Sequence, residues 1–197
     1  MRVRLNQGEL KYCDYMAKQR HAVSRKLGVE DRKRGKQSAD FIDLQGVAGE
    51  FAFCKLFNIY PDTNIISYAP YDCVAMGVGT VEVKTTEYPN GRLSVPLGES
   101  GKVGTGNKDK CADYYVLMTG NASDISRPVD FTMAGWVAGA DLLIRKRVGW
   151  LPGIEKTDDM RSYIIEQHEL CDPEEWPQVN SMQCSIHWLE HLNRLRV

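Results

Sequence analysis

Two stretches near the start of the chain have the pattern of long helices. Residues 8–27 lack Pro, are rich in Lys, Arg, Ala and Leu, and end at Gly28, a typical C-cap residue. This pattern predicts a helix whose exposed face is basic. Residues 44–57, LQGVAGEFAFCKLF, put apolar side chains on every side of a helical wheel, which is typical of a buried helix. Ser38 or Asp40 is expected to cap this second helix.

The middle of the chain changes to a strand pattern. Residues 72–76 and 80–88 flank glycines at 77 and 79 and predict a hairpin. Strict alternation in the second strand places Val81 and Val83 on one face and Glu82, Lys84 and Thr86 on the other. The Asn90-Gly91 pair predicts a second hairpin turn, after which residues 92–97 return alongside.

The rest of the chain gives further elements. Residues 113–120, DYYVLMTG, have the β-branched and aromatic content of a central strand. The Gly-rich, charged stretch 98–110 indicates a flap. Weaker strand patterns, and a closing helix, complete the predicted elements: strands at 65–68, 135–143 and 162–166, and the helix at 181–195. The predicted fold class is therefore α/β, or α+β, with a mixed sheet flanked by helices.

Length and charge limit the function classes. With 197 residues and a net charge of -1, the chain fits a single domain and has no overall basic field. The charge is uneven, because residues 1–36 hold eleven Lys or Arg and four Asp or Glu. We therefore expect one domain over 1–197: a basic N-terminal helix and loop over 1–36, a core over 40–170 and the closing helix.

Cysteine usage and hydropathy predict the compartment. No apolar run approaches the roughly 18 to 20 residues that cross a bilayer, and the first residues lack the apolar stretch of a signal peptide. The six cysteines are widely spaced and form no CxxC, which favours free thiols. We expect a cytoplasmic protein without a membrane partner.

The predicted hairpin at 72–88 brings together residues with catalytic potential. Glu82 and Lys84 are two positions apart on one strand and share a face. Pairing of the two strands places Asp72 beside them. Mg2+ is commonly held by one or two carboxylates, with water and substrate phosphate as the other ligands, and Asp72 and Glu82 meet that need. Lys84 could position the attacking water or stabilise charge on a phosphodiester.

A solvated strand face explains the Glu82 and Lys84 pair equally well, because ExK is frequent by chance. Glu50 adds weight to the catalytic interpretation. This carboxylate lies on a helix that is apolar all round, where it is costly to bury unless it binds a metal or pairs with a cation. If Glu50 has only a structural role, Arg92 is the candidate cation to pair with it.

The order of these segments resembles a known superfamily. GVAGEFAFCKLF, YDCVAMG, VEVK, ADYYVLM and GWVAGADLL follow one another as in the PD-(D/E)XK, or restriction-endonuclease-like, nucleases. The resemblance covers roughly residues 40–170, and the run EVKTTEYPNGRL is similar to small nuclease-like proteins of phages and their hosts. It implies a restriction-endonuclease-like mixed β-sheet flanked by helices, and a phage-encoded or bacterial cytoplasmic setting.

The resemblance also implies roles for individual residues. Asp72, Glu82 and the backbone carbonyl of Val83 would coordinate Mg2+, for which Mn2+ could substitute, Lys84 would orient the water, and Glu50 would be an auxiliary metal-binding acid. Pro61-Asp62 spells the family's "PD", but Asp62 is expected in a turn, so Asp72 is preferred. Thr86 stands where several family members carry Gln, a departure from the pattern.

Several cations are candidates for contact with the DNA backbone. Arg92, Lys102 and Lys108 lie on the second hairpin and the flap, where they could hold phosphates or could be ordinary solvated charges. The N-terminal helix and loop supply a second basic set, which could neutralise several phosphates or could merely solubilise the chain: Arg20, Arg25, Lys26, Arg32, Lys33, Arg34 and Lys36.

These observations predict a Mg2+-dependent deoxyribonuclease, more readily an endonuclease than an exonuclease, that hydrolyses DNA with metal-activated water. A catalytically inactive DNA-binding or assembly protein on the same fold is the alternative, and two-fold assembly into a homodimer would allow paired cuts. Cys184, His187 and His191 could build a zinc site, although the same positions fit a helix that faces the core.

Overall fold

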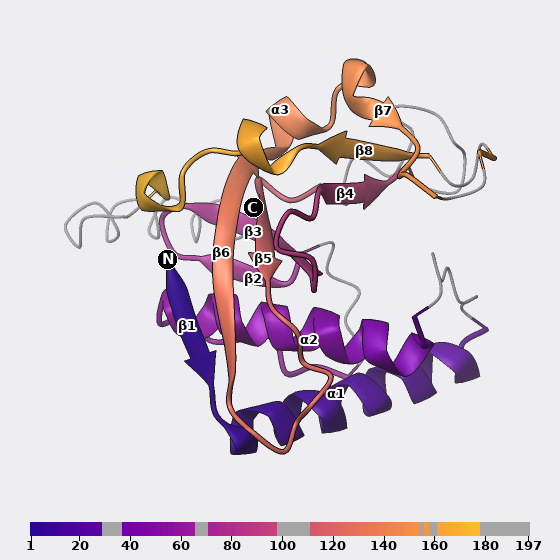
Figure 1. The fold of residues 1–197 in the computed structure, drawn as a ribbon, viewed down its shortest axis with the longest axis vertical. Helices are drawn as coiled ribbons and strands as arrows, with labels where there is room; N and C mark the ends of the chain where they lie inside the picture. Colours follow the sequence, from indigo (N-terminus) through magenta and orange to yellow (C-terminus); the bar gives the residue numbers. More distant parts are fainter. Residues whose placement is uncertain (29–36, 66–70, 98–110, 154–155, 158–160, 178–197) are drawn as a thin grey trace, which may run out of the picture.

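The protein has a mixed α/β fold, seen here in a computed structural model (Figure 1). The structure describes residues 1–28, 37–65, 71–97, 111–153, 156–157 and 161–177. No helix within these ranges is long and apolar enough to cross a membrane. The predicted flap at 98–110 and closing helix at 181–195 lie outside the described residues, as does most of the strand predicted at 65–68.

A five-stranded mixed sheet forms the centre of the molecule. Its order is β1 (Arg2–Leu5), β6 (Val129–Ala138), β5 (Tyr114–Thr119), β3 (Gly79–Thr86) and β2 (Cys73–Ala75). Strands β3 and β5 run parallel, and the other neighbours are antiparallel. The predicted hairpin of β2 and β3 is confirmed, and so is the central place of β5.

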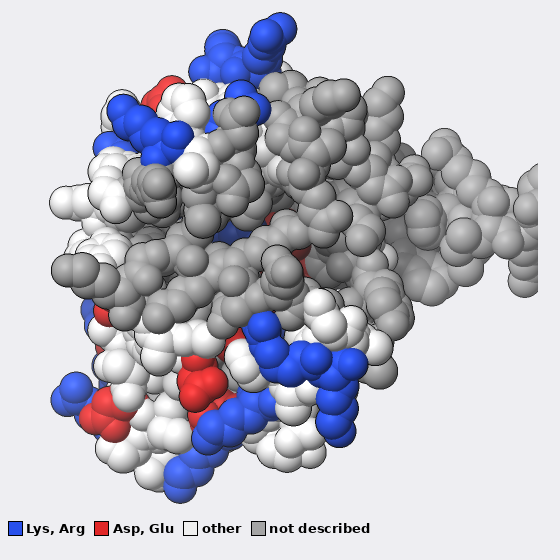
Figure 2. Space-filling model, turned by 90° about the vertical axis from the view of Figure 1, so that its right-hand side faces the viewer, with Lys and Arg blue, Asp and Glu red and all other residues white. Residues whose placement is uncertain are grey.

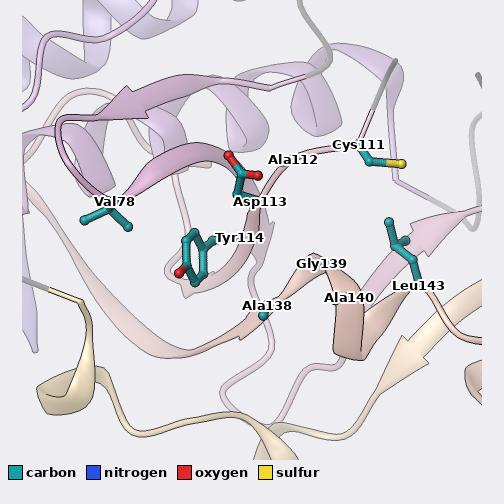
Figure 3. A pocket seen from close by; sticks show the side chains of 9 residues that line it. All are labelled: Val78, Cys111, Ala112, Asp113, Tyr114, Ala138, Gly139, Ala140 and Leu143. Atoms are coloured by element: carbon teal, nitrogen blue, oxygen red, sulfur yellow. The ribbon is translucent and has the colours of Figure 1, made fainter. Parts of the chain in front are cut away.

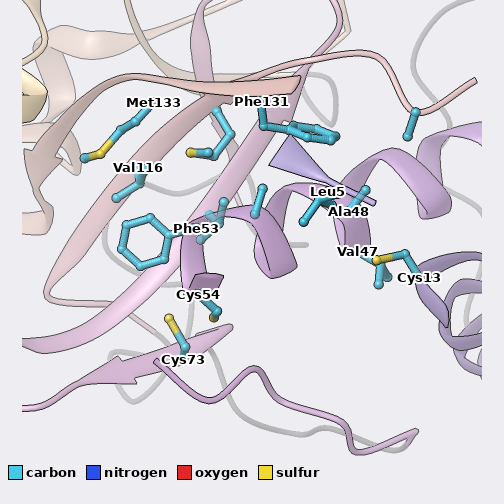
Figure 4. Packing of buried hydrophobic residues seen from close by; sticks show 14 of the residues in the cluster. Leu5, Cys13, Val47, Ala48, Phe53, Cys54, Cys73, Val116, Phe131 and Met133 are labelled. Carbon is cyan, nitrogen blue, oxygen red and sulfur yellow. The ribbon is translucent and has the colours of Figure 1, made fainter. Parts of the chain in front are cut away.

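Two long helices cover one face of this sheet. Helix α2 (Ala39–Leu56) packs directly on the strands, and α1 (Gln7–Lys26) lies against its outer side (Figure 1). The Ser38 hydroxyl caps α2 by accepting a hydrogen bond from the Phe41 N–H, as predicted. The core between α2 and the sheet contains Phe53, Val116 and Met133, all with almost no exposed surface (Figure 4). The apolar wheel of α2 is thus buried, as its sequence indicates.

A smaller antiparallel sheet covers the opposite face. Its order is β4 (Leu93–Pro96), β8 (Ser162–Ile165) and β7 (Val148–Gly149). It packs through a second core, in which Leu93 and Ile165 meet Tyr115 and Leu117 of β5. Short helical turns join these strands: α3 (Gly139–Leu142) and the 3-10 helices η2 (Arg145–Arg147), η4 (Gln167–Glu169) and η5 (Pro173–Glu175). Glu82 and Lys84 of β3 lie on this same face of the main sheet, because they stand in register with Tyr115 and Leu117.

Two predicted strand assignments are wrong. Residues 92–97 do not return along β3, because β4 pairs with β8 in the small sheet. A Cβ at Gly91 would lie 2.4 Å from the Thr86 side chain, so the turn after β3 passes tightly over the end of that strand before the chain leaves the sheet. The strand predicted at 135–143 ends at Ala138 and gives way to α3. Strand β1 is a further element that the sequence pattern does not predict.

The prediction of free thiols is confirmed for the described cysteines. Cys13, Cys54, Cys73, Cys111 and Cys171 form no disulfide. Cys54 of α2 and Cys73 of β2 face one another across the core (Figure 4). The neighbouring Cys54 thiol and burial raise the pKa of Cys73, so the Cys73 thiol is a packing group rather than a nucleophile.

Candidate active site

The candidate site lies at the edge of β3, just beyond the segment of β3 that pairs with β2. Pairing of β2 with β3 runs from Gly79 to Val81. One residue before β2, the Asp72 N–H donates to the Val81 carbonyl at 2.9 Å, and the Asp72 carboxylate accepts from the Val83 N–H at 2.7 Å. The side chain of Asp72 therefore continues the ladder beyond Cys73, the first residue of β2. This contact fixes its carboxylate beside the ExK segment.

The backbone of Val83 contributes to the same edge. The N–H and C=O of one strand residue point to the same side, so the Val83 carbonyl shares this edge with the Asp72 carboxylate. Glu82 and Lys84 project from one face of the strand, as the alternation predicts, and form an ion pair with each other. Their side chains are 20% and 31% exposed, so the pair is half-buried and reachable.

Glu50 approaches β3 from the helical side of the sheet. Its neighbour Gly49 explains how close α2 comes, because a Cβ at Gly49 would lie 1.8 Å from the Thr85 hydroxyl oxygen. Only a glycine permits this approach of helix to strand. The Glu50 side chain is 15% exposed, and its carboxylate is held near Glu82 and Lys84, whose charges shift its pKa. Glu50 in turn raises the pKa of Asp72.

Arg20 of α1 is the structural partner of Glu50. Its guanidinium donates to the Glu50 carboxylate at 2.8 Å, to the Asp62 carbonyl at 2.8 Å and to the Asn64 carbonyl at 3.3 Å. The expectation of Arg92 as the structural partner of Glu50 is wrong, because Arg92 binds Glu166 of the small sheet at 2.7 Å. The sequence makes Arg20 a candidate for DNA contact, whereas the structure pairs it with Glu50, and no local pattern signals a contact between residues thirty positions apart.

The carboxylates of the site repel one another in a partly dehydrated setting. Burial raises the pKa of Asp72 to about 8, and the nearby charges of Glu50 and Glu82 add to the shift. Burial likewise raises the pKa of Glu50, against the opposing effect of Arg20. For Lys84, burial alone would lower the pKa, but Glu82, Asp72 and Glu50 raise it. The site thus holds more negative charge than its own cations balance, and it favours an added proton or cation.

The oxygen atoms of the site suit a hard divalent cation, although the described residues form no complete set of side-chain ligands. Within the described residues, no three His, Cys, Asp or Glu side chains converge to hold a metal ion. Mg2+ does not require such a cage, because one or two carboxylates suffice when water and phosphate complete its coordination. Asp72, Glu82 and the Val83 carbonyl are oxygen ligands of the required kind, and burial, together with the charges of Glu50 and Glu82, raises the pKa of Asp72.

Asp62, the alternative ligand, has a different role. Its carboxylate accepts from the Asn64 backbone N–H at 2.9 Å and from the Asn64 side chain at 2.8 Å, so it closes the turn that follows Pro61. The structure brings Asp72, and not Asp62, to the backbone of the ExK segment.

The candidate DNA-contacting cations are only partly visible. Arg25 is exposed near the C-terminal end of α1, and Arg92 is neutralised by Glu166. Lys26 is also exposed at the end of α1, and the other candidates lie outside the described residues: Lys102, Lys108, Arg32, Lys33, Arg34 and Lys36. So do Cys184, His187 and His191 of the candidate zinc site.

A separate pocket of about 490 Å³ opens at the start of β5 (Figure 3). Asp113 and Tyr114 line it together with Gly139 and Leu143. The Asp113 carboxylate is occupied in accepting hydrogen bonds from the Thr80 N–H and hydroxyl, at 2.9 and 2.8 Å. The pocket is not part of the candidate site, because none of the site residues lines it: Asp72, Glu82, Lys84 and Glu50.

Comparison with known proteins adds no assignment: no family model, no curated protein and no solved structure matches this chain significantly. The functional argument therefore depends on the geometry of the site.

Proposed function

We propose that the chain is a divalent-metal-dependent nuclease of the PD-(D/E)XK, restriction-endonuclease-like type that hydrolyses DNA phosphodiester bonds as an endonuclease. One observation carries this proposal. Asp72, Glu82, Lys84 and Glu50, which are scattered over 35 positions of the chain, come together at the open edge of one strand in a mixed sheet. A merely solvated Glu-Lys pair would not require the buried Glu50 or the Asp72 side chain bonded to the strand backbone.

In this proposal Asp72, Glu82 and the Val83 carbonyl hold Mg2+, or Mn2+ in its place, and Glu50 is an auxiliary acid for the same or a second ion. The ion supplies a water of lowered pKa and neutralises charge on the phosphate. Asp72 is kept in place by the Val83 N–H, and Arg20 keeps Glu50 in place. The Lys84 ammonium, held among three carboxylates, orients the attacking water and offsets the charge that builds on the phosphodiester.

A catalytically inactive DNA-binding protein on the same fold is the second candidate. The observation that favours it is that both cations of the site are already paired, Lys84 with Glu82 and Arg20 with Glu50. Cations that are paired in this way need no substrate phosphate to be stable. The two candidates differ in whether metal ions confer cleavage.

The test is a cleavage assay with wild-type protein on linear, supercoiled and branched DNA. We expect cleavage with Mg2+ or Mn2+, including nicking or linearisation of the supercoiled circle, which has no ends for an exonuclease. EDTA should abolish it. DNA binding without cleavage of any of these substrates, at any Mg2+ or Mn2+ concentration, would support the inactive DNA-binding protein instead.

A further inference from the structure

A short basic turn on the small sheet has a fixed conformation. Helix η2 and β7 bring Arg145–Arg147 and Trp150 together on one connection. The Arg147 guanidinium donates to the Asp141 carbonyl at 3.0 Å and to the Glu169 carboxylate at 3.2 Å. The Trp150 indole N–H donates to the Thr157 carbonyl at 2.9 Å. Arg147 therefore ties the turn to Asp141 of α3 and to Glu169 of η4, and Trp150 ties the residues after it to Thr157.

The two cations at the tip of this turn have no partner in the described part of the chain. Arg145 and Lys146 are exposed, and neither side chain forms a hydrogen bond or ion pair with another described residue. The nearby carboxylates Glu166 and Glu169 are already paired, with Arg92 and Arg147. Asp141 is the only acidic residue among 139–150, where three residues are basic, so the segment has a net positive charge.

The turn belongs to the layer that borders the candidate site. The small sheet packs on the face of the main sheet that carries Glu82 and Lys84, whereas α1 and α2 lie on the other face. Figure 1 places β7 and α1 at opposite ends of the molecule, above and below the edge of β3. On the side turned to the viewer in Figure 2, Lys and Arg atoms gather near the top and near the bottom of the view, and most of the visible Asp and Glu atoms lie within the lower group.

We infer that Arg145 and Lys146 contact the phosphate backbone of the DNA substrate, away from the phosphodiester bond that is cleaved. This inference rests on the proposed function, since it takes DNA as the substrate. An anchored turn loses little conformational entropy on binding, and free guanidinium and ammonium groups replace counterions on phosphates. The turn would position the duplex without reading its sequence, because backbone contacts carry no sequence information.

The test compares DNA binding of wild type with an Arg145→Ala plus Lys146→Ala variant by fluorescence anisotropy in EDTA, over a range of salt concentrations. Loss of two phosphate contacts should reduce the slope of log K against log salt by about 2 and weaken binding on the order of tenfold. The charge-preserving variant Arg145→Lys plus Lys146→Arg should retain the wild-type slope. Arg4→Ala plus Arg127→Ala removes the same charge from elements outside the turn and α1 and should change the slope little.

An unchanged slope in the Arg145→Ala plus Lys146→Ala variant would overturn the inference, as would absence of DNA binding by wild type. An equal reduction in the Arg4→Ala plus Arg127→Ala variant would also overturn it, because net charge and not the turn would then be responsible. A cleavage assay on the same DNA separates the two proposals. If the Arg145→Ala plus Lys146→Ala variant has a reduced slope but wild type does not cleave DNA, the turn is still a DNA contact. That result would contradict only the proposed nuclease function.

Discussion

Asp72→Asn is expected to lower Mg2+-dependent DNA cleavage by at least about 10³-fold, because it removes a charged metal ligand. The amide oxygen of the new side chain can still accept the hydrogen bond from the Val83 N–H, so the strand edge should keep its structure. The measurement is kcat/KM on supercoiled DNA. Asp14→Asn, which changes a carboxylate to an amide in the i,i+4 pair with Lys18, should cleave at the wild-type rate. Cleavage within about tenfold of wild type in the Asp72→Asn variant would contradict the assigned role.

The same substitution should stabilise the metal-free protein at high pH. The pKa of Asp72 is raised to about 8 in the folded state, against about 4 when unfolded. The folded state therefore binds this proton more tightly, and wild type loses stability as the pH rises from about 4 to about 8. An amide at this position has no such proton to lose. In EDTA at pH 8.5 we expect Asp72→Asn to raise the free energy of unfolding by about 1–3 kcal/mol, and at pH 4 to change it little.

Urea unfolding in EDTA at the two pH values measures this effect. Asp130→Asn is a control of opposite sign, because the hydrogen bond from Arg4 lowers the pKa of Asp130 to about 2. Its charged form is the stabilising one, but its partners Arg2 and Arg4 are largely exposed, so this variant should lose only a little stability at pH 8.5. A loss of stability at pH 8.5 in Asp72→Asn would show that Asp72 is held by favourable pairing, and not by crowding with other carboxylates.

Arg20→Ala is expected to have the second large effect, on stability. It leaves the Glu50 carboxylate without its partner and two carbonyls, of Asp62 and Asn64, without their donor. Removal of one member of a buried pair costs about 3–5 kcal/mol, and since these side chains keep some exposure we expect about 2–3 kcal/mol in urea unfolding. A second substitution, Glu50→Gln, should recover part of the loss because it removes the unpaired charge.

Arg4→Ala is the matched control for this prediction. Arg4 also pairs with a carboxylate, Asp130, but its side chain is 67% exposed, compared with 22% for Arg20. Solvent-exposed ion pairs contribute little to stability, so Arg4→Ala should be nearly neutral. Equal losses in the Arg4→Ala and Arg20→Ala variants, or no recovery with Glu50→Gln, would contradict the assigned pairing.

The sequence predicts those parts of the candidate site that depend on local periodicity. Alternation along 80–88 is sufficient to place Glu82 and Lys84 on one face, because side chains on a strand repeat every two residues. The apolar wheel of 44–57 marks Glu50 as a carboxylate in an unfavourable setting. The glycine turn at 77–79 fixes the register that brings Asp72 to the strand edge. Each of these relations spans a few residues.

Relations between distant segments could not be predicted in this way. Arg20 has the same local pattern as its exposed neighbours on α1, and only the packing of α1 against α2 turns it toward Glu50. The pairing of β4 with β8 joins residues about seventy positions apart, which a hairpin signal at Asn90-Gly91 cannot reveal. Strand β1, four residues long, owes its conformation to pairing with β6.

The most direct test of the central claim is calorimetric titration of Mg2+ and Mn2+ into wild type and into Glu82→Gln, with and without DNA. We expect saturable binding to wild type, strengthened by DNA because its phosphate completes the coordination, and weak or no binding to Glu82→Gln. Binding should be weaker below about pH 8, where a proton competes at Asp72. Equal binding to both proteins, or no binding even with DNA present, would contradict a metal site at the edge of β3.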